Sequence, residues 1–202
     1  MRYFKLIYLL MLSSILSVFG CDDMNSDKKI TDSSGAMQEF RQNIEANRIL
    51  TRQMLDTTVD EKLEGKIIAN INSKQDQDLG NEKDILPTLS NERQAIYYIY
   101  LVEAGVNNGG FDQFYLNQFI NTDGSYMFNK TSGAFQMIKA IKFADLVERA
   151  NQIFKAEEKD FWEKGGLFGE LDQEFYNTYK KENLFDLRIK FIRENIAAFV
   201  DE

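Results

Sequence analysis

Residues 105–117 read Gly-Val-Asn-Asn-Gly-Gly-Phe-Asp-Gln-Phe-Tyr-Leu-Asn, and this stretch separates two apolar segments of the chain. Glycine and asparagine tolerate positive φ, so Gly109-Gly110 can end one helix and let the next leave at a sharp angle. Upstream, Ser90 is a good N-cap for an aromatic-rich helix, and downstream a second helix begins near Phe111. The stretch therefore predicts a corner between two packed helices.

This corner supplies the candidate functional residues of the chain, which are Asn107, Asn108, Gly109, Gly110, Phe111, Gln113, Phe114 and Asn117. In one interpretation, the amide side chains satisfy free backbone groups at the helix ends. In the other, the four amides line a small polar recess that binds a peptide or a sugar. Gln113 and Asn117 lie one helical turn apart under either interpretation. The sequence leaves both interpretations open.

Outside the corner, apolar residues recur at helical spacing. A strict i, i+4 ladder is formed by Val59, Leu63, Ile67 and Ile71. Polar residues predict loops over 72–84 and 121–131, and a long helix is predicted over about 132–154. No alternating pattern of period two persists, so we expect an all-α fold with a single multi-helix domain.

The N-terminus has the features of a bacterial lipoprotein precursor. Arg2 and Lys5 precede an apolar run over residues 6–19, and Gly20 is followed by Cys21, the only cysteine. The run is shorter than the roughly 20 residues of a spanning helix. We expect residues 1–20 to be a signal peptide, Cys21 to be lipidated, and residues 21–36 to be a flexible tether. The protein would then be exported and lipid-anchored to the cell membrane or the outer membrane.

Composition excludes several classes of function. The chain has no histidine and a single cysteine, which removes histidine-based triads, thiol proteases, zinc sites and disulfides. We see no EF-hand loop, P-loop or dinucleotide motif, so we expect no metal and no cofactor. With 24 basic and 32 acidic residues, the net charge of −8 also argues against direct nucleic-acid binding.

Two segments carry a resemblance to a known family. They are Leu89-Ser90-Asn91-Glu92-Arg93 with Tyr97-Tyr98, followed by Asn108-Gly109-Gly110-Phe111-Asp112-Gln113-Phe114-Tyr115-Leu116-Asn117. With the helix at 132–154 and Leu171-Asp172-Gln173-Glu174-Phe175-Tyr176, the chain resembles a domain of unknown function named after a bacterial DNA-mimic protein.

The resemblance covers roughly residues 86–200 and implies an all-α fold. The protein that gives the family its name is cytosolic and acidic, and it occupies the DNA-binding face of a transcription factor. Most members have no assigned activity. We therefore expect a DNA-mimic-like domain over 86–202, preceded by an N-terminal helical extension over 37–85.

Three classes of function follow from these observations. The first is a non-enzymatic, membrane-tethered module that binds an unknown protein partner. The second is a DNA-mimic or immunity-type protein that binds a basic partner through the acidic stretch from Asp145 to Glu174. The third is a carboxylate-based enzyme or a small-ligand binder. Glu103 is the only plausible base for an enzyme, and its position on the helix predicts a solvated side chain. Of the three, we expect the first.

Overall fold

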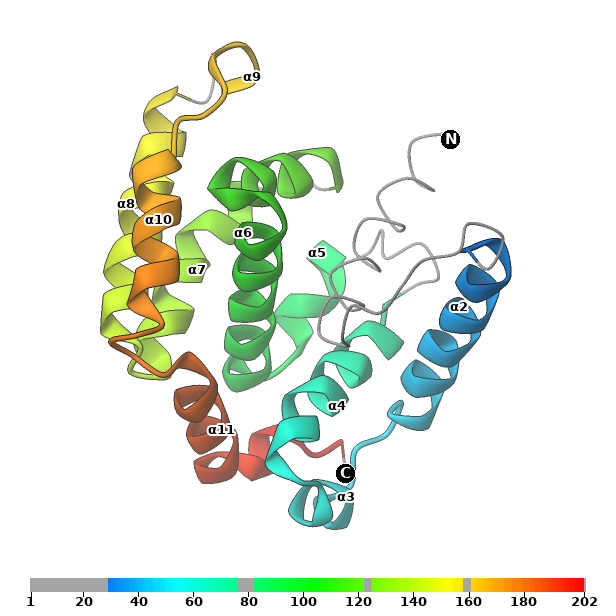
Figure 1. The fold of residues 1–202 in the computed structure, drawn as a ribbon. Coiled ribbons are helices and arrows are strands. Elements are labelled where there is room, and N and C mark those ends of the chain that lie inside the picture. The colour runs from blue at the N-terminus through cyan, green and yellow to red at the C-terminus, as the bar shows by residue number, and fades with distance from the viewer. Residues whose placement is uncertain (1–28, 76–81, 122–124, 158–160, 202) are drawn as a thin grey trace. The chain divides into compact units, whose positions relative to one another are not determined.

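The computed structural model describes residues 29–75, 82–121, 125–157 and 161–201, which are coloured in Figure 1. In these ranges every regular element is helical, so the predicted all-α fold is confirmed. The contacts divide the chain into two units, Met1–Gln42 and Asn43–Glu202. The predicted signal peptide and Cys21 lie outside the described residues.

The described part of the first unit belongs to helix α2, Lys29–Ala46. The tether predicted over residues 21–36 is therefore helical from Lys29 onward. Several residues of this segment, such as Thr31, Asp32 and Ser33, have low intrinsic helix propensity. The helix propensities of such residues are at most about 0.7 kcal/mol per residue less favourable than that of alanine. This penalty is small enough for the helix to extend through them.

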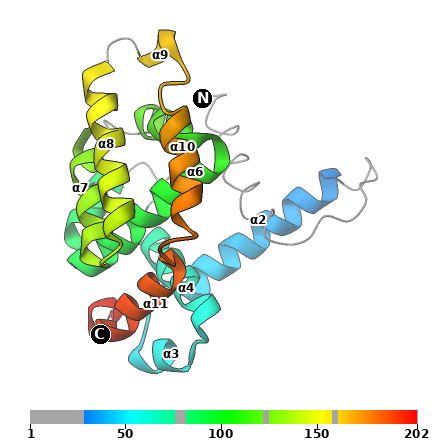
Figure 2. The same ribbon diagram turned by 60° about the vertical axis from the view of Figure 1, so that its left-hand side comes forward.

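The second unit contains the remaining helices (Figures 1 and 2). They are α3 (Arg52–Thr57), α4 (Asp60–Ser73), α5 (Glu82–Ile85), α6 (Asn91–Asn121), α7 (Ser125–Met137), α8 (Ile141–Glu157), α9 (Phe161–Lys164), α10 (Gly169–Thr178) and α11 (Leu184–Glu194), with 3₁₀ helices η2 (Leu86–Thr88) and η3 (Ile196–Phe199). Ser90 caps α6 as predicted, because its Oγ accepts a hydrogen bond from Arg93 N at 3.2 Å.

Two of the predicted loops are shorter than expected. The loop predicted over 72–84 loses its ends to α4 and α5, and α7 already begins at Ser125 within the loop predicted over 121–131. The polar residues at the ends of the predicted loops include good helix formers, such as Glu82 and Lys83. Polarity alone therefore overestimated the lengths of the loops.

The long helix predicted over 132–154 is wrong, since α7 and α8 are separated by a hairpin at residues 138–140. Lys139 has φ 66°, in the left-handed region. Lys139 N donates to Gln136 O and Ala140 N donates to Phe135 O, both at 2.9 Å, which is the hydrogen-bond pattern of a Schellman motif. Glycine usually occupies the left-handed position, so the lysine gave no sequence signal for the break.

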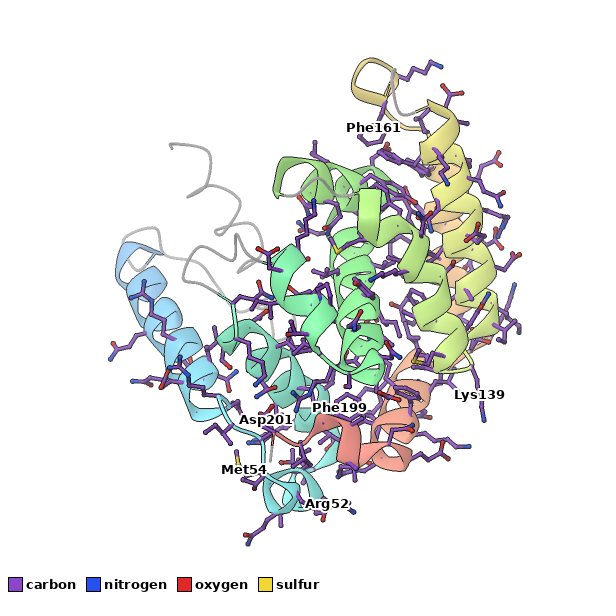
Figure 3. The ribbon with its side chains drawn as sticks, turned by 180° about the vertical axis from the view of Figure 1, so that it is seen from behind. Arg52, Met54, Lys139, Phe161, Phe199 and Asp201 are labelled. Carbon is purple, nitrogen blue, oxygen red and sulfur yellow. The ribbon has the colours of Figure 1, made fainter. Side chains whose placement is uncertain are left out.

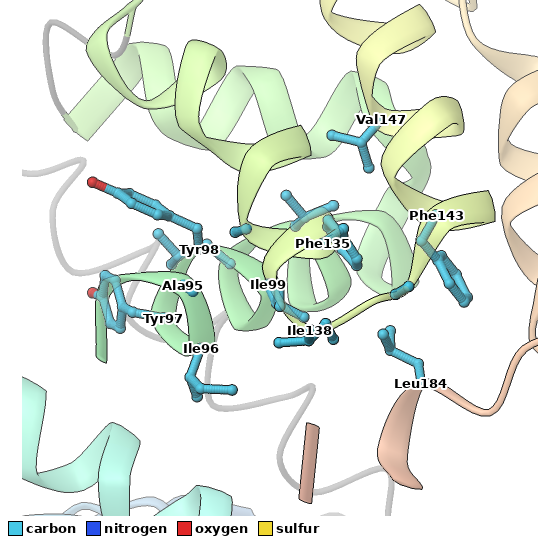
Figure 4. Packing of buried hydrophobic residues seen from close by; sticks show 14 of the residues in the cluster. Ala95, Ile96, Tyr97, Tyr98, Ile99, Phe135, Ile138, Phe143, Val147 and Leu184 are labelled. Atoms are coloured by element: carbon cyan, nitrogen blue, oxygen red, sulfur yellow. The ribbon is translucent and has the colours of Figure 1, made fainter. Parts of the chain in front are cut away.

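One hydrophobic core joins the helices of the second unit. Figure 4 shows the part around α6, where Ile99 lies beside Phe135 of α7 and near Ile138. Residues from the predicted N-terminal extension, among them Leu63 and Ile67 of α4, are fully buried in the same cluster. Helices α4 and α6 therefore pack in one core.

A polar clasp holds the last described residue, Asp201, to the start of the second unit (Figure 3). Asp201 Oδ2 accepts hydrogen bonds from Leu50 N at 2.8 Å and Asn70 Nδ2 at 2.7 Å, while Oδ1 accepts one from Arg93 Nη1 at 2.7 Å. The Lys74 ammonium lies 2.9 Å from Oδ1. Burial raises the Asp201 pKa, but the Leu50 amide and the two cations outweigh it and lower the pKa to about 2.

Candidate functional site at the glycine corner

The corner predicted at Gly109-Gly110 is a sharp kink inside α6. Gly110 has φ 77°, while Gly109 has φ 176° and ψ 29°, so neither residue continues the helix. Just before the kink, Gly105 lies against the second half of α6. A Cβ on Gly105 would lie 2.8 Å from both Cα and Cβ of Phe114. The two halves approach this closely only because residue 105 has no side chain.

Helix α10 holds both halves of the kinked helix. Asp172 Oδ1 accepts a hydrogen bond from Phe111 N at 2.8 Å and so caps the second half. Tyr176, one turn further along α10, donates its hydroxyl to Val106 O at 2.8 Å in the first half. We call Asp172 and Tyr176 the α10 clamp. The clamp connects the Asn-Gly-Gly-Phe segment to the Leu171–Tyr176 segment, which are two of the segments on which the family resemblance rests.

The aromatic residues of the corner belong to the core. Phe111 is fully buried and meets Phe175 edge to face at a centroid distance of 5.7 Å. Phe114 is 1% exposed, and the neighbouring Tyr115 stacks on Phe154 at 4.3 Å. Of the eight candidates, Phe111 and Phe114 therefore fix the corner from inside and offer no surface to a ligand.

The amide side chains of the corner make bonds to other side chains. Gln113 Nε2 donates to Asn117 Oδ1 at 2.7 Å, in agreement with their predicted position one turn apart. Asn107 makes a side-chain hydrogen bond with Tyr179 and is exposed, as is Asn108. The helix end at Phe111 is capped by Asp172. The structure thus brings Gln113 and Asn117 together and places Asn107 beside α10.

Two carboxyl groups at the kink, those of Asp112 and Asp172, have raised pKa values. Burial raises the pKa of Asp112, and the negative charge of Asp172 raises it further, while the backbone of Gly166 and Leu167 opposes the shift. Burial also raises the pKa of Asp172, against the hydrogen bond from the Phe111 amide. Removing the Asp172 charge would therefore make Asp112 easier to ionise.

Glu103 does not lie on a solvated helix face, so this expectation was wrong. Its Oε1 accepts the Tyr179 hydroxyl at 2.5 Å, and its Oε2 forms an ion pair with Arg188 Nη1. The Glu103 side chain is 19% exposed and that of Arg188 is 8% exposed. Arg188 lies on the buried face of α11, together with Leu184 and Ile192. The only base that the sequence offered for catalysis is thus paired with a buried cation.

Glu64 of α4 completes this buried network. Its Oε2 lies 3.3 Å from Arg188 Nε. Burial raises the pKa of Glu64 to about 7, with Arg188 lowering it and Glu103 raising it. The pKa of Tyr179 is also raised, first by burial and then by the charge of Glu103. A chain of polar contacts therefore runs from Asn107 at the corner through Tyr179, Glu103 and Arg188 to α4.

Sequence reasoning did not single out the groups that build the site, namely Glu64, Asp112, Asp172, Tyr179 and Arg188. For Arg188, the sequence does contain a pattern that indicates its role. Arg188 stands four residues from both Leu184 and Ile192 on the buried stripe of α11, where an unpaired cation would be costly. A buried acidic partner could have been predicted from that position.

The described part of the chain offers no group of three or more His, Cys, Asp or Glu side chains that could hold a metal ion. A search of the same residues finds no helix with the length and apolar character needed to cross a bilayer.

Residues 87–195 match the DMP19-like protein family. The chain belongs to the DMP19-like family. The match includes the glycine corner, the α10 clamp, Glu103 and Arg188, and it begins after α4, so Glu64 lies outside it. Comparison with curated proteins finds no match, and comparison with solved structures finds none either.

Proposed function

We propose that this DMP19-like protein is a membrane-tethered, non-enzymatic module that binds a protein partner through the amides of the glycine corner. The observation that carries the proposal is the α10 clamp. Because Asp172 caps the helix at Phe111, none of the amide side chains of the corner is needed as that cap. Asn107 and Asn108 are exposed and Gln113 and Asn117 are half-buried, on a backbone fixed by two contacts from another helix.

The chemistry of the amide pair favours a peptide partner. The hydrogen bond from Gln113 Nε2 to Asn117 Oδ1 does not use the Gln113 carbonyl oxygen or the Asn117 NH₂ group, so both can bond to a partner. Together they offer one acceptor and one donor, the complement of a peptide group with its N–H and C=O. Asn107 and Asn108 add further exposed amides on the other side of the kink.

A non-enzymatic role is supported by the environment of Glu103. A general base must be free to take a proton from a substrate within hydrogen-bond reach. Both Glu103 oxygens are engaged, one by the Tyr179 hydroxyl and the other by the Arg188 guanidinium. This arrangement favours a structural ion pair.

The membrane tether rests on the sequence features at residues 1–21. A thiol that carries two acyl chains anchors stably, whereas one chain gives only marginal binding. Replacing Cys21 by Ser should therefore release the protein from membranes or leave the precursor uncleaved. Processed, membrane-bound Cys21→Ser protein would contradict the tether.

The binding role is tested by affinity capture from solubilised membranes with the full chain. The double variant Gln113→Ala/Asn117→Ala should lose the captured partner at least tenfold and keep the wild-type melting temperature. Gln136→Ala, an exposed amide on α7, is the matched control and should capture normally. A double variant that melts early and captures in proportion to its folded fraction would assign these amides a structural role.

A second candidate function is supported by the surface of α8 and α10, which pack side by side (Figure 1). Exposed acids lie along both helices, at Asp145, Glu148, Glu170 and Glu174. We propose that a DNA-mimic role would use this face against a basic partner. Arg149 forms ion pairs with Asp145 and Glu174 and so reduces the negative charge of this face. Binding to such a partner should fall steeply between low and moderate salt, and salt-insensitive binding would contradict it.

A further inference from the structure

One end of the second unit combines exposed apolar side chains with lysines. Ile141, at the start of α8, is 59% exposed, and Phe185, in the first turn of α11, is 39% exposed. Lys139 and Lys142 flank Ile141, while Lys180 and Lys181 precede Phe185, and all four lysines are exposed. We call these six residues the basic tip.

Glu182 brings the two parts of the basic tip together. Its Oε2 accepts hydrogen bonds from Lys142 N at 3.1 Å and Phe143 N at 3.3 Å, so it caps α8 from the loop between α10 and α11. The α7–α8 hairpin therefore lies against the loop that carries Lys180 and Lys181. Figure 3 shows Lys139 at this hairpin, with its side chain extending away from the ribbon.

The charge of the basic tip is opposite to that of the chain, which carries −8 overall. None of the ion pairs found among the described residues uses Lys139, Lys142, Lys180 or Lys181. The nearby acids are engaged differently. Glu182 caps α8, Asp186 accepts from Asn183 Nδ2 at 2.6 Å, and Asp145 pairs with Arg149. The four lysines are free of these ion pairs, and after the charges of Glu182 and Asp186 are subtracted a net positive charge surrounds the two exposed apolar side chains.

We propose that the basic tip docks on an anionic lipid surface. Lysines attract anionic headgroups, and their long stems let the ammonium groups stay at headgroup level while neighbouring apolar side chains enter the interface. Ile141 and Phe185 are placed to enter in this way because they project from helix starts at the end of the unit. The acidic faces of α8 and α10 would repel the same surface, so docking fixes which end of the protein meets the membrane.

This inference extends the proposed tether, since the tether would bring the domain close to a bilayer, and it is tested separately from it. The full chain is mixed with vesicles of phosphatidylcholine alone, or with 30% phosphatidylglycerol, and exposed lysines are acetylated and quantified by mass spectrometry. The lysines of the basic tip should react at least threefold more slowly on the anionic vesicles. Lys62 and Lys155, which are exposed on α4 and α8, should react equally on both.

Salt separates docking from anchoring, because charge attraction is screened beyond a Debye length of about 3 Å at 1 M salt. At 1 M NaCl the protection should disappear, while vesicle flotation through a lipid anchor should persist. Ile141→Ser/Lys181→Glu should abolish the protection of the remaining tip lysines, whereas the control Lys62→Glu/Lys155→Glu should preserve it.

Equal acetylation on neutral and anionic vesicles would overturn the docking proposal, whether or not the chain floats with the vesicles. Protection by soluble polyglutamate together with none by anionic vesicles would also overturn it and assign the basic tip to an acidic protein. Protection on anionic vesicles at low salt, together with loss of flotation at 1 M NaCl, would support docking and contradict the tether.

Discussion

The glycine corner and the α7–α8 hairpin both break a helix with a residue at positive φ, yet they do so under different constraints. At the corner, Gly110 has φ 77° and a Cβ there would collide with the Asp172 carboxyl group, so both the backbone conformation and the space disfavour a side chain. At the hairpin, Lys139 has φ 66° with an exposed side chain, and backbone hydrogen bonds alone close the turn. In this protein, glycine thus occupies the break that a side chain of another helix contacts, and lysine occupies the break whose side chain is exposed.

The largest expected effect comes from adding one carbon to the corner. In Gly110→Ala, the new Cβ would lie 2.8 Å from Asp172 Cγ, in a left-handed conformation. Strain of about 1–2 kcal/mol and overpacking of similar size should lower the free energy of unfolding by about 3 kcal/mol. Chemical denaturation followed by circular dichroism measures this loss. Gly133→Ala, in open space on α7, is the matched control and should be neutral or stabilising.

The clamp residue should show the next largest effect. Asp172→Ala leaves Phe111 N without its acceptor, at an expected cost of about 2 kcal/mol. The same substitution removes the carboxyl group with which the new Cβ of Gly110→Ala would clash. The double variant should therefore lose about 1 kcal/mol less than the sum of the two single variants. Strict additivity would mean that the cost of a side chain at Gly110 comes from the positive φ alone and not from contact with Asp172.

At the hairpin, adding glycine should have the opposite sign. Lys139→Gly relieves the left-handed strain of a residue with a Cβ, and part of the gain is offset because glycine is more flexible in the unfolded chain. We expect the protein to become about 0.5–1 kcal/mol more stable in the same denaturation assay. Gln136→Gly, three residues earlier inside α7, should be destabilised by a similar amount. Loss of stability in Lys139→Gly would erase the distinction between the two breaks.

The smallest effect concerns the charge at the corner. Asp172→Asn keeps an oxygen that can accept from Phe111 N, so stability at pH 7 should change by less than about 0.5 kcal/mol. The Asp172 pKa is raised by burial, so the folded state binds more protons than the unfolded state above the unfolded pKa near 3.8. Wild-type stability therefore decreases as pH rises through the folded pKa, and this component is absent in Asp172→Asn.

Relative to wild type, Asp172→Asn should thus gain stability as the pH is raised from 3.5 to 7. Denaturant titrations of both proteins over this range measure the difference, and all other titrating groups cancel to the extent that they do not interact with Asp172. A difference that stays constant or shrinks with pH would show that ionised Asp172 is not disfavoured in the fold.

Sequence patterns predicted the elements whose signal is local. The Ser90 cap and the amide pair at Gln113 and Asn117 depend on residues three and four positions apart, and the glycine corner depends on its own dipeptide. The hairpin escaped prediction because lysine occupies the left-handed position there. Polar composition predicted loops where short helix ends lie, since packing decides whether such ends stay helical.

The remaining parts of the site depend on residues far apart in the chain. Asp172 and Phe111 are 61 positions apart, and Arg188 and Glu103 are 85 positions apart. A single sequence gives the chemistry of such residues but not which of them meet. For Glu103 the missing partner reversed the prediction, because a helix position that looked solvated lies against α10 and α11.

The clasp between Leu50 and Asp201 has a consequence for the order of folding. Its two ends are separated by 151 positions, whereas the α7–α8 hairpin closes over a few residues. The entropic cost of closure rises with the logarithm of loop length, by about 0.6 kcal/mol for each doubling. We therefore expect helix pairs such as α7–α8 to form early and the clasp to form last. Until it does, Leu50 and Asn70 lack their hydrogen bonds to the C-terminal segment, and the Leu50 side chain, fully buried in the folded core, stays accessible to chaperones and proteases.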